Sequence, residues 1–322
     1  HKEAIHLNVE HLRYPHQLDP NDQTAAYSLA VGFFDGVHKG HQAVIKNAIE
    51  KAQELNIESA VMTFDPHPSI VLGGRKEKVF YITPLQQKID LFRKMGVQNV
   101  FVVHFTSDFA KLSPEEFIQY FIRDLNVKHV SAGFDFTFGQ FGKGNMEMMK
   151  QLSNGDYGVS VINKQADEEE KISSTRIRQY LQDGDMESAA RLLGRAFKVP
   201  GIVVHGDKRG RTIGFPTANI QPSEGSFIPG TGVYAVRIKI QDKWYDGVCN
   251  VGYKPTFKNP NDKQLSIEVH ILDFNKNIYG EEVVVGWYKR IRSEQKFDGI
   301  ESLKAQIEKD KNEAIQYFLN LS

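Results

Sequence analysis

The chain has 322 residues, 40% hydrophobic and 25% charged, which is typical of a globular protein with two domains. Its 40 basic and 40 acidic side chains balance, so it lacks the basic excess of a dedicated duplex-binding protein, and we expect no nucleic-acid partner. No apolar run reaches the roughly 18 residues that span a bilayer, and no signal-peptide pattern is visible, so we expect no membrane partner. The single cysteine, Cys249, favours a reducing compartment, so we expect a cytoplasmic protein.

The first half of the chain alternates strand-like and helix-like patterns. Helices are predicted over 42–55 and 84–95, and another begins near Ser113, which has the residue type of an N-cap. A buried strand is predicted over 28–34, and further strands are predicted over 59–64, 99–105, 128–133 and 158–162. This alternation is typical of a parallel sheet covered by helices, in which ligands bind beyond the carboxyl ends of the strands.

The second half contains consecutive strands without helices between them. The predicted strands are 201–205, 232–240, 243–251, 265–272 and 282–291, separated by turns rich in Gly, Pro, Asn and Asp. This pattern indicates an antiparallel barrel or sandwich, followed by one long helix with an apolar face from Ile300 to Phe318. We expect domains over 1–186 and 187–322.

A glycine- and histidine-rich string follows the first predicted strand and opens the first helix. A helix N-terminus binds phosphate through its N–H groups and its dipole, and Gly36 and Gly40 allow close approach of the backbone. His38 and His41 are three residues apart, so both can face one ligand and donate to phosphate oxygens. The alternatives are a plain turn with surface histidines, and a zinc site, for which no third ligand stands at a suggestive spacing.

Two further segments suit chemistry in the second half. Residues 205–219 begin with glycines and three cations, as in an anion-binding loop or an exposed basic hairpin, and end in Phe-Pro-Thr-Ala-Asn. In the strand 265–272, Glu268 shares one face with Ser266 and His270, which indicates either simple solvent exposure or a place for a catalytic carboxylate.

Several strings of the sequence resemble one family. Residues 32–41 (GFFDGVHKGH) resemble the HxGH signature of nucleotidyltransferases. Together with 172–178 (ISSTRIR) and 214–219 (GFPTAN), they resemble the prokaryotic bifunctional riboflavin kinase/FAD synthetases over essentially the whole chain. The resemblance implies a Rossmann-like nucleotidyltransferase domain and a β-barrel riboflavin kinase domain. It also implies that riboflavin is phosphorylated to FMN and FMN is adenylylated to FAD, with ATP as co-substrate, Mg²⁺ as cofactor and pyrophosphate as a product.

The resemblance also implies roles for residues of the first domain. Phe33 stands where the family usually has Asn, so we leave it out of the site. The expected adenylyltransferase residues are His38 and His41 in catalysis, Gly36, Gly40, Ser174, Thr175 and Arg178 at ATP, and Phe64, Pro66, Pro68, Asp135 and Phe136 at the flavin.

For the second domain, the resemblance makes Glu268 the base that accepts the proton of the riboflavin 5′-hydroxyl. The other expected kinase residues are Thr217 and Asn219 at Mg²⁺, Gly206, Lys208 and Gly214 at ATP, and Arg292 at the flavin. Two alternatives stay open: only one activity is retained, Phe33 making adenylyl transfer the more vulnerable, or the chain is a non-catalytic flavin- or RNA-binding protein.

Overall fold

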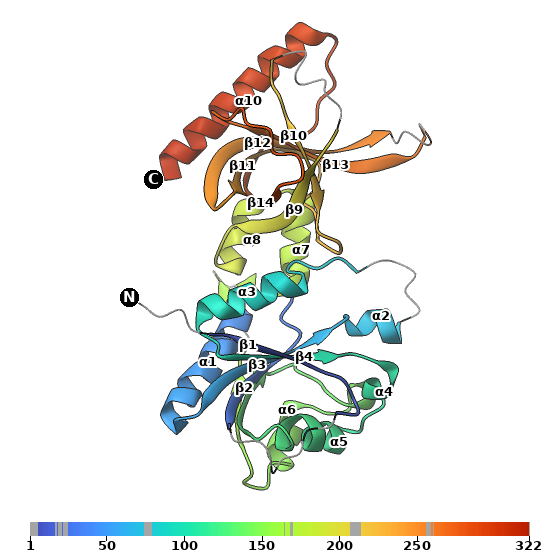
Figure 1. The fold of residues 1–322 in the computed structure, drawn as a ribbon, viewed down its shortest axis with the longest axis vertical. Helices are drawn as coiled ribbons and strands as arrows, with labels where there is room; N and C mark the ends of the chain where they lie inside the picture. Colours follow the sequence, from blue (N-terminus) through green and yellow to red (C-terminus); the bar gives the residue numbers. More distant parts are fainter. Residues whose placement is uncertain are drawn as a thin grey trace. The chain divides into compact units, whose positions relative to one another are not determined.

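The computed structural model describes residues 6–16, 18, 21, 25–73, 79–163, 165–167, 170–206, 214–255, 259 and 261–321. The chain divides into two compact units, His1–Ser173 and Ser174–Ser322 (Figure 1). This division lies before helix α7 (Ser174–Asp183), whereas the sequence pattern predicted a boundary after it. No helix in the described ranges is long and apolar enough to cross a membrane.

The first unit is built on a six-stranded sheet with the order β1-β4-β3-β2-β5-β6, in which all pairs are parallel. The prediction of a parallel sheet is confirmed, although the first strand was missed. The strands are β1 (Asn8–Leu12), β2 (Tyr27–Val31), β3 (Glu58–Asp65), β4 (Asn99–His104), β5 (Val127–Gly133) and β6 (Gly158–Ile162). A two-stranded ribbon, β7 (Ala166–Asp167) and β8 (Glu170–Lys171), follows.

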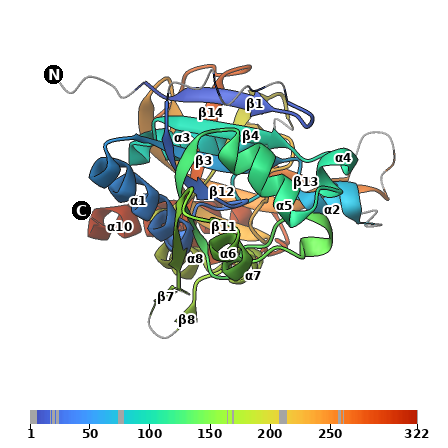
Figure 2. The same cartoon turned by 90° about the horizontal axis from the view of Figure 1, so that it is seen from below.

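Helices cover both faces of this sheet, as Figures 1 and 2 show. Alternate strand residues separate into two cores: Met62 packs with α5 and α6, while its neighbour Val61 packs with α1 and α3. The helical segments are α1 (Lys39–Leu55), α2 (Pro68–Leu72), α3 (Leu85–Met95), α4 (Ser107–Ala110), α5 (Pro114–Ile118), η2 (Gln119–Arg123), η3 (Gln140–Gly142) and α6 (Met146–Gln151). Ser113 caps α5, as predicted.

The second unit is a closed antiparallel barrel with the order β10-β13-β12-β11-β14-β9. The barrel is therefore confirmed over the sandwich. Its strands are β9 (Phe197–Val204), β10 (Ala218–Pro222), β11 (Gly232–Ile240), β12 (Lys243–Pro255), β13 (Lys263–Ile271) and β14 (Glu282–Arg292). Helix α8 (Met186–Leu193) packs on β9 and β14, and the predicted terminal helix α10 (Ile300–Leu321) packs on β11, β12 and β14.

Candidate active sites

The turn between β2 and α1 lies at the carboxyl edge of the sheet, where the strand order reverses between β2 and β5. His38 is the N-cap of α1, and its Nδ1 accepts the backbone N–H of His41 at 3.1 Å. His41 Nδ1 accepts the His38 N–H at 3.3 Å, and the two rings stack with centroids 3.5 Å apart. This capping box starts the helix at Lys39, earlier than the predicted start at residue 42.

Because both Nδ1 atoms accept, the neutral imidazoles of His38 and His41 carry their protons on Nε2. An Nε2–H group is the donor that a phosphate oxygen needs. The His38 ring can occupy its observed position because residue 40 is a glycine. A Cβ at Gly40 would lie 2.9 Å from Cε1 of His38. The turn thus presents paired imidazole donors at a helix N-terminus, as an anion site requires.

The segment before α3 holds the same turn from the other side. The buried Asp35 carboxylate accepts the backbone N–H groups of Ile82 (3.2 Å) and Thr83 (3.0 Å). The N–H of Gly36, whose φ is +95°, donates to Thr83 Oγ1 at 2.7 Å. The predicted ATP contact of Gly36 therefore cannot use this N–H while the bond persists.

The predicted flavin residues follow the neighbouring strands. Phe64 and Pro66 lie at the end of β3, Pro68 begins α2, and Asp135 and Phe136 follow β5. Phe64 is 8% exposed and belongs to the core, so it has a packing role, whereas Asp135 is exposed and Phe136 half-buried. The strand ends bring these residues to one edge; their contact with flavin stays a prediction.

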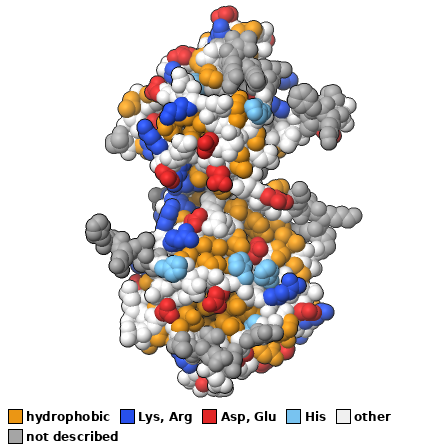
Figure 3. Space-filling model, viewed as in Figure 1, with side chains coloured by type: hydrophobic (Ala, Val, Ile, Leu, Met, Phe, Trp, Pro, Cys, Tyr) orange, Lys and Arg blue, Asp and Glu red, His pale blue; other side chains and the backbone are white. Residues whose placement is uncertain are grey.

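This edge carries apolar surface. Figure 3 shows hydrophobic side chains and histidines gathered on one face of the first unit. Ile70 and Leu72 of α2 are 50% and 64% exposed, and Phe134 after β5 is 46% exposed. Exposed apolar side chains at the same sheet edge as a helix N-terminus suit a ligand that has both a planar ring and an anionic group.

Phe33, which the sequence reading left out, lies at the centre of this edge. Its ring packs edge-on against His67, with centroids 4.6 Å apart, and lies 5.9 Å from the ring of Tyr81. The ammonium of Lys88 lies 4.3 Å from its centroid. The Phe33 ring thus packs against the segments that carry His67 and Tyr81 and against Lys88 of α3. A smaller Asn side chain at this position would leave space.

Three predicted ATP residues belong to the other compact unit. Ser174, Thr175 and Arg178 occupy the first part of α7, which lies in the second unit. Their expected role at the ATP phosphates stays a prediction.

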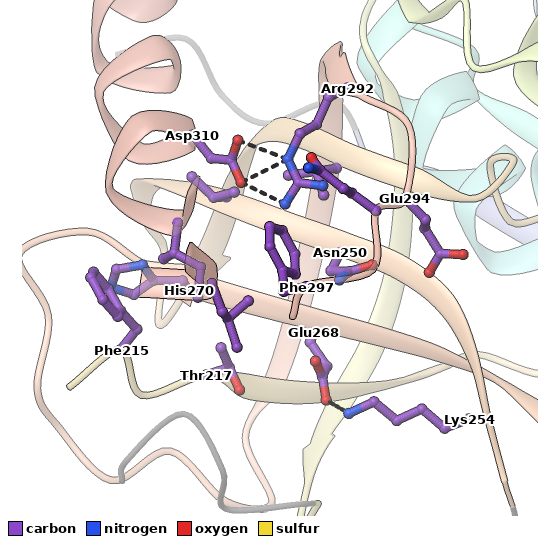
Figure 4. A pocket seen from close by; sticks show the side chains of 15 residues that line it. Phe215, Thr217, Asn250, Lys254, Glu268, His270, Arg292, Glu294, Phe297 and Asp310 are labelled. Carbon is purple, nitrogen blue, oxygen red and sulfur yellow. Dashed lines mark hydrogen bonds and ion pairs between the residues drawn. The ribbon is translucent and has the colours of Figure 1, made fainter. Parts of the chain in front are cut away.

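The second unit holds a cavity of about 240 Å³ between the barrel and α10 (Figure 4). Three predicted site residues, Thr217, Glu268 and Arg292, line it. The remaining lining is Phe215, Val233, Val248, Asn250, Lys254, His270, Glu294, Gln295, Phe297, Leu303, Ile307 and Asp310. The cavity combines apolar and aromatic walls with a few polar groups, as pockets for small organic ligands do.

Strand register places the predicted metal ligand beside the predicted base. Asn219 of β10 is paired with Glu268 of β13, which is paired with Asn250 of β12. Asn219 does not line this cavity; its side chain packs over Gly206, where a Cβ would overlap it. The absence of a side chain at Gly206 therefore leaves room for the Asn219 amide.

The Glu268 carboxylate forms an ion pair with Lys254, shown by the dashed line in Figure 4. His270 lies two residues beyond Glu268 in β13, and burial lowers its pKa. Its Nδ1 has no hydrogen-bond partner among the described residues. The cavity therefore contains a carboxylate, an ammonium and an imidazole whose neutral form is favoured. The carboxylate is placed to accept a proton once a substrate hydroxyl comes within reach.

Arg292 lines the cavity, but its guanidinium is bound to the protein. It donates from Nε and Nη2 to the carboxylate of Asp310, at 2.9 to 3.1 Å, and Gln306 donates to the same carboxylate at 2.9 Å. The Asp310 side chain is 3% exposed. The pair fixes the end of β14 to α10, and the predicted flavin contact of Arg292 stays a prediction.

A second cavity of about 420 Å³ adjoins the first, and Thr217 lines both. Its walls include Phe274, Asn277 and Tyr279, and the ring of Tyr279 stacks on His205 at 3.8 Å between centroids. Gly206 follows β9, Gly214 has a φ of +86°, and the predicted Lys208 lies outside the described residues.

The sequence reading missed several residues at these sites. Lys254 and Asp310 pair with predicted residues, and Phe297 and Tyr279 provide cavity walls. Within the described ranges, no three His, Cys, Asp or Glu side chains cluster as metal ligands.

The fold is that of a two-domain transferase, with one candidate site in a parallel α/β unit and one in a closed barrel. The family model of FAD synthetase matches residues 20–176, and that of riboflavin kinase matches residues 193–318. The chain belongs to the bifunctional riboflavin kinase/FMN adenylyltransferase family.

Relatives match along nearly the whole chain. The bifunctional riboflavin kinase/FMN adenylyltransferase of Bacillus subtilis is 51% identical over 315 residues, 98% of this chain and 99% of the relative. That of Listeria monocytogenes is 47% identical over 293 residues, 91% and 93% of the two chains. A crystal structure described as a macrolide-efflux protein from Streptococcus pneumoniae is 37% identical, with a TM-score of 0.85 over 94% of this chain and 97% of that one.

Proposed function

We propose that this chain converts riboflavin to FAD at two separate sites. The barrel transfers the γ-phosphoryl group of ATP to riboflavin, which gives FMN and ADP. The first unit transfers AMP from a second ATP to FMN, which gives FAD and pyrophosphate. The observation that supports this most is that each family signature lies at a candidate site: the paired imidazoles at the sheet edge, and the Thr217 and Glu268 side chains in the barrel cavity.

In the barrel, the cavity under α10 takes the flavin ring, because Phe297 and aliphatic side chains line it. The adjoining cavity takes ATP, so Thr217 lies where the γ-phosphate meets the 5′-hydroxyl. Glu268 accepts the hydroxyl proton as the phosphoryl group transfers. The hydroxyl of Thr217 and the amide oxygen of Asn219 are hard donors that fit Mg²⁺, which neutralises charge on the ATP phosphates when bound.

In the first unit, a phosphate oxygen of FMN attacks the α-phosphorus of ATP and pyrophosphate leaves. The Nε2–H groups of His38 and His41 donate to the phosphate oxygens as negative charge develops. The positive end of α1 acts in the same direction. This mechanism forms no covalent enzyme intermediate, so positioning and electrostatics provide the rate enhancement.

The test is incubation of the full chain with riboflavin, ATP and MgCl₂, followed by chromatography of the flavins. The wild-type protein should form FMN and then FAD. His41→Ala should stop at FMN, whereas Asn219→Ala should make FAD only from added FMN. Loss of the same step in both variants would refute the assignment of two sites, and failure to convert added FMN would show that adenylyl transfer is absent.

We also place the enzyme in the cytoplasm, where the buried, unpaired thiol of Cys249 stays reduced. Cell fractionation that recovers the protein from an oxidising compartment would contradict this placement.

A further inference from the structure

A lysine is buried beneath the histidine turn of the first unit. Lys88 lies on α3 and is 3% exposed, which is rare for an ammonium group. Its Nζ donates to the backbone carbonyl of Phe33 at 2.9 Å and to Thr63 Oγ1 at 2.8 Å. The Thr63 hydroxyl in turn donates to the same carbonyl at 2.9 Å. The ammonium therefore joins the end of β2 to β3 at the sheet edge.

The Phe33 carbonyl belongs to the turn that leads to His38. The other end of this turn is held through Asp35 and Gly36, which bind the segment just before α3. Lys88 of α3 and the segment just before α3 therefore hold the turn at two points, the Phe33 carbonyl and the Asp35–Gly36 pair. Loss of the hydrogen bond to the Phe33 carbonyl would shift the backbone that leads to His38, and with it the His38 imidazole.

A buried ammonium costs free energy that an apolar side chain of similar length would not. Burial lowers the pKa of Lys88 to about 8, against the attraction of the Asp35 and Asp65 carboxylates. Those two groups face it from the turn and from β3, and His67 and Tyr81 lie beyond the Phe33 ring. The unfavourable burial of charge beside a catalytic edge indicates a role other than packing.

We propose that Lys88 is a positioning residue for adenylyl transfer, and that its ammonium fixes the Phe33 carbonyl and so the turn that carries Gly36 and His38. The inference rests on the proposed assignment of FAD formation to this site. Lys88 touches neither substrate in this account; it acts through the backbone of the turn.

The test compares Lys88→Met and Lys88→Gln with Lys94→Met, a matched control that removes an exposed lysine from the same helix. The Met variant lacks charge and donor, while the Gln variant keeps an N–H donor. Both Lys88 variants should lower kcat for FAD formation from FMN at least about tenfold, because the turn shifts, with little change in the KM for ATP. Riboflavin phosphorylation in the barrel should stay at the wild-type rate, as both rates should in the Lys94 control.

The pH profile gives a second readout that a purely structural lysine would not move. The wild-type rate of FAD formation should fall as the pH rises through about 8, where Lys88 loses its proton, and the Gln variant should lack this alkaline limb. A Met variant with wild-type kcat, an effect on KM alone, an unchanged alkaline limb in the Gln variant, or a loss explained wholly by the unfolded fraction would overturn the proposal. If the wild type makes no FAD from FMN, the proposed function of the first unit is wrong and the inference falls with it.

Discussion

Gly40→Ala should separate helix stability from catalysis in the first unit. Alanine in place of glycine within a helix ordinarily stabilises it by up to about 1 kcal/mol. Here the new Cβ would lie 2.9 Å from Cε1 of His38 and 3.1 Å from its Nδ1, whereas ordinary contacts begin at 3.4 Å. The imidazole must therefore move by about 0.5 Å from its observed position. Since a misplacement of about 1 Å can cost about 100-fold, we expect about a tenfold lower kcat for FAD formation.

The assay measures FAD formed from added FMN and FMN formed from riboflavin by the same protein. Only the first rate should fall, and the thermal midpoint of the first unit should change little, because the gain in helix propensity offsets the weaker cap by His38. Gly299→Ala is the matched control, because a Cβ at Gly299 would meet open space in the second unit. A Gly40→Ala variant that makes FAD at the wild-type rate would refute the claim that this glycine sets the position of the His38 ring.

Three further predictions concern the barrel and the metal. Glu268→Gln should slow FMN formation about 100- to 10,000-fold, yet leave FAD formation from FMN intact; equal loss of both would contradict its role as base. Asp310→Ala should destabilise the second unit by about 3–5 kcal/mol, because Arg292 loses its buried partner. The only tryptophans, Trp244 and Trp287, lie in that unit, so urea unfolding followed by fluorescence measures this directly. Chelation by EDTA should stop both reactions and MgCl₂ should restore them, whereas activity in EDTA would exclude the proposed cation.

Much of the fold follows from hydrophobic patterning. The predicted ranges 158–162 and 232–240 coincide with β6 and β11, because turn residues delimit both segments, β6 has valines at alternate positions and β11 is largely buried. Strand β10 was missed, since Ala218–Pro222 contains amide side chains and a proline. It forms because pairing with β9 and β13 closes the barrel, and this long-range pairing leaves no mark in the local sequence.

The motifs predicted the candidate sites, whereas the residues that support them became visible only in the structure. Lys88 stands among the apolar positions of α3, and its acceptors come from Phe33 and Thr63, on other elements. The Lys254 and Asp310 partners likewise depend on strand register and helix docking. A single sequence records which residues are reactive, whereas the groups that hold them in place are fixed by tertiary contacts.

The shared wall at Thr217 has a stereochemical consequence. Under the proposed function, a nucleotide in one cavity and a flavin in the other would meet at this residue, so the γ-phosphorus would pass between them in a single in-line displacement. Each such displacement inverts the configuration at the phosphorus atom. ATP made chiral at this atom with oxygen isotopes should therefore yield FMN of inverted configuration, and retention would require two successive displacements through a phosphorylated side chain.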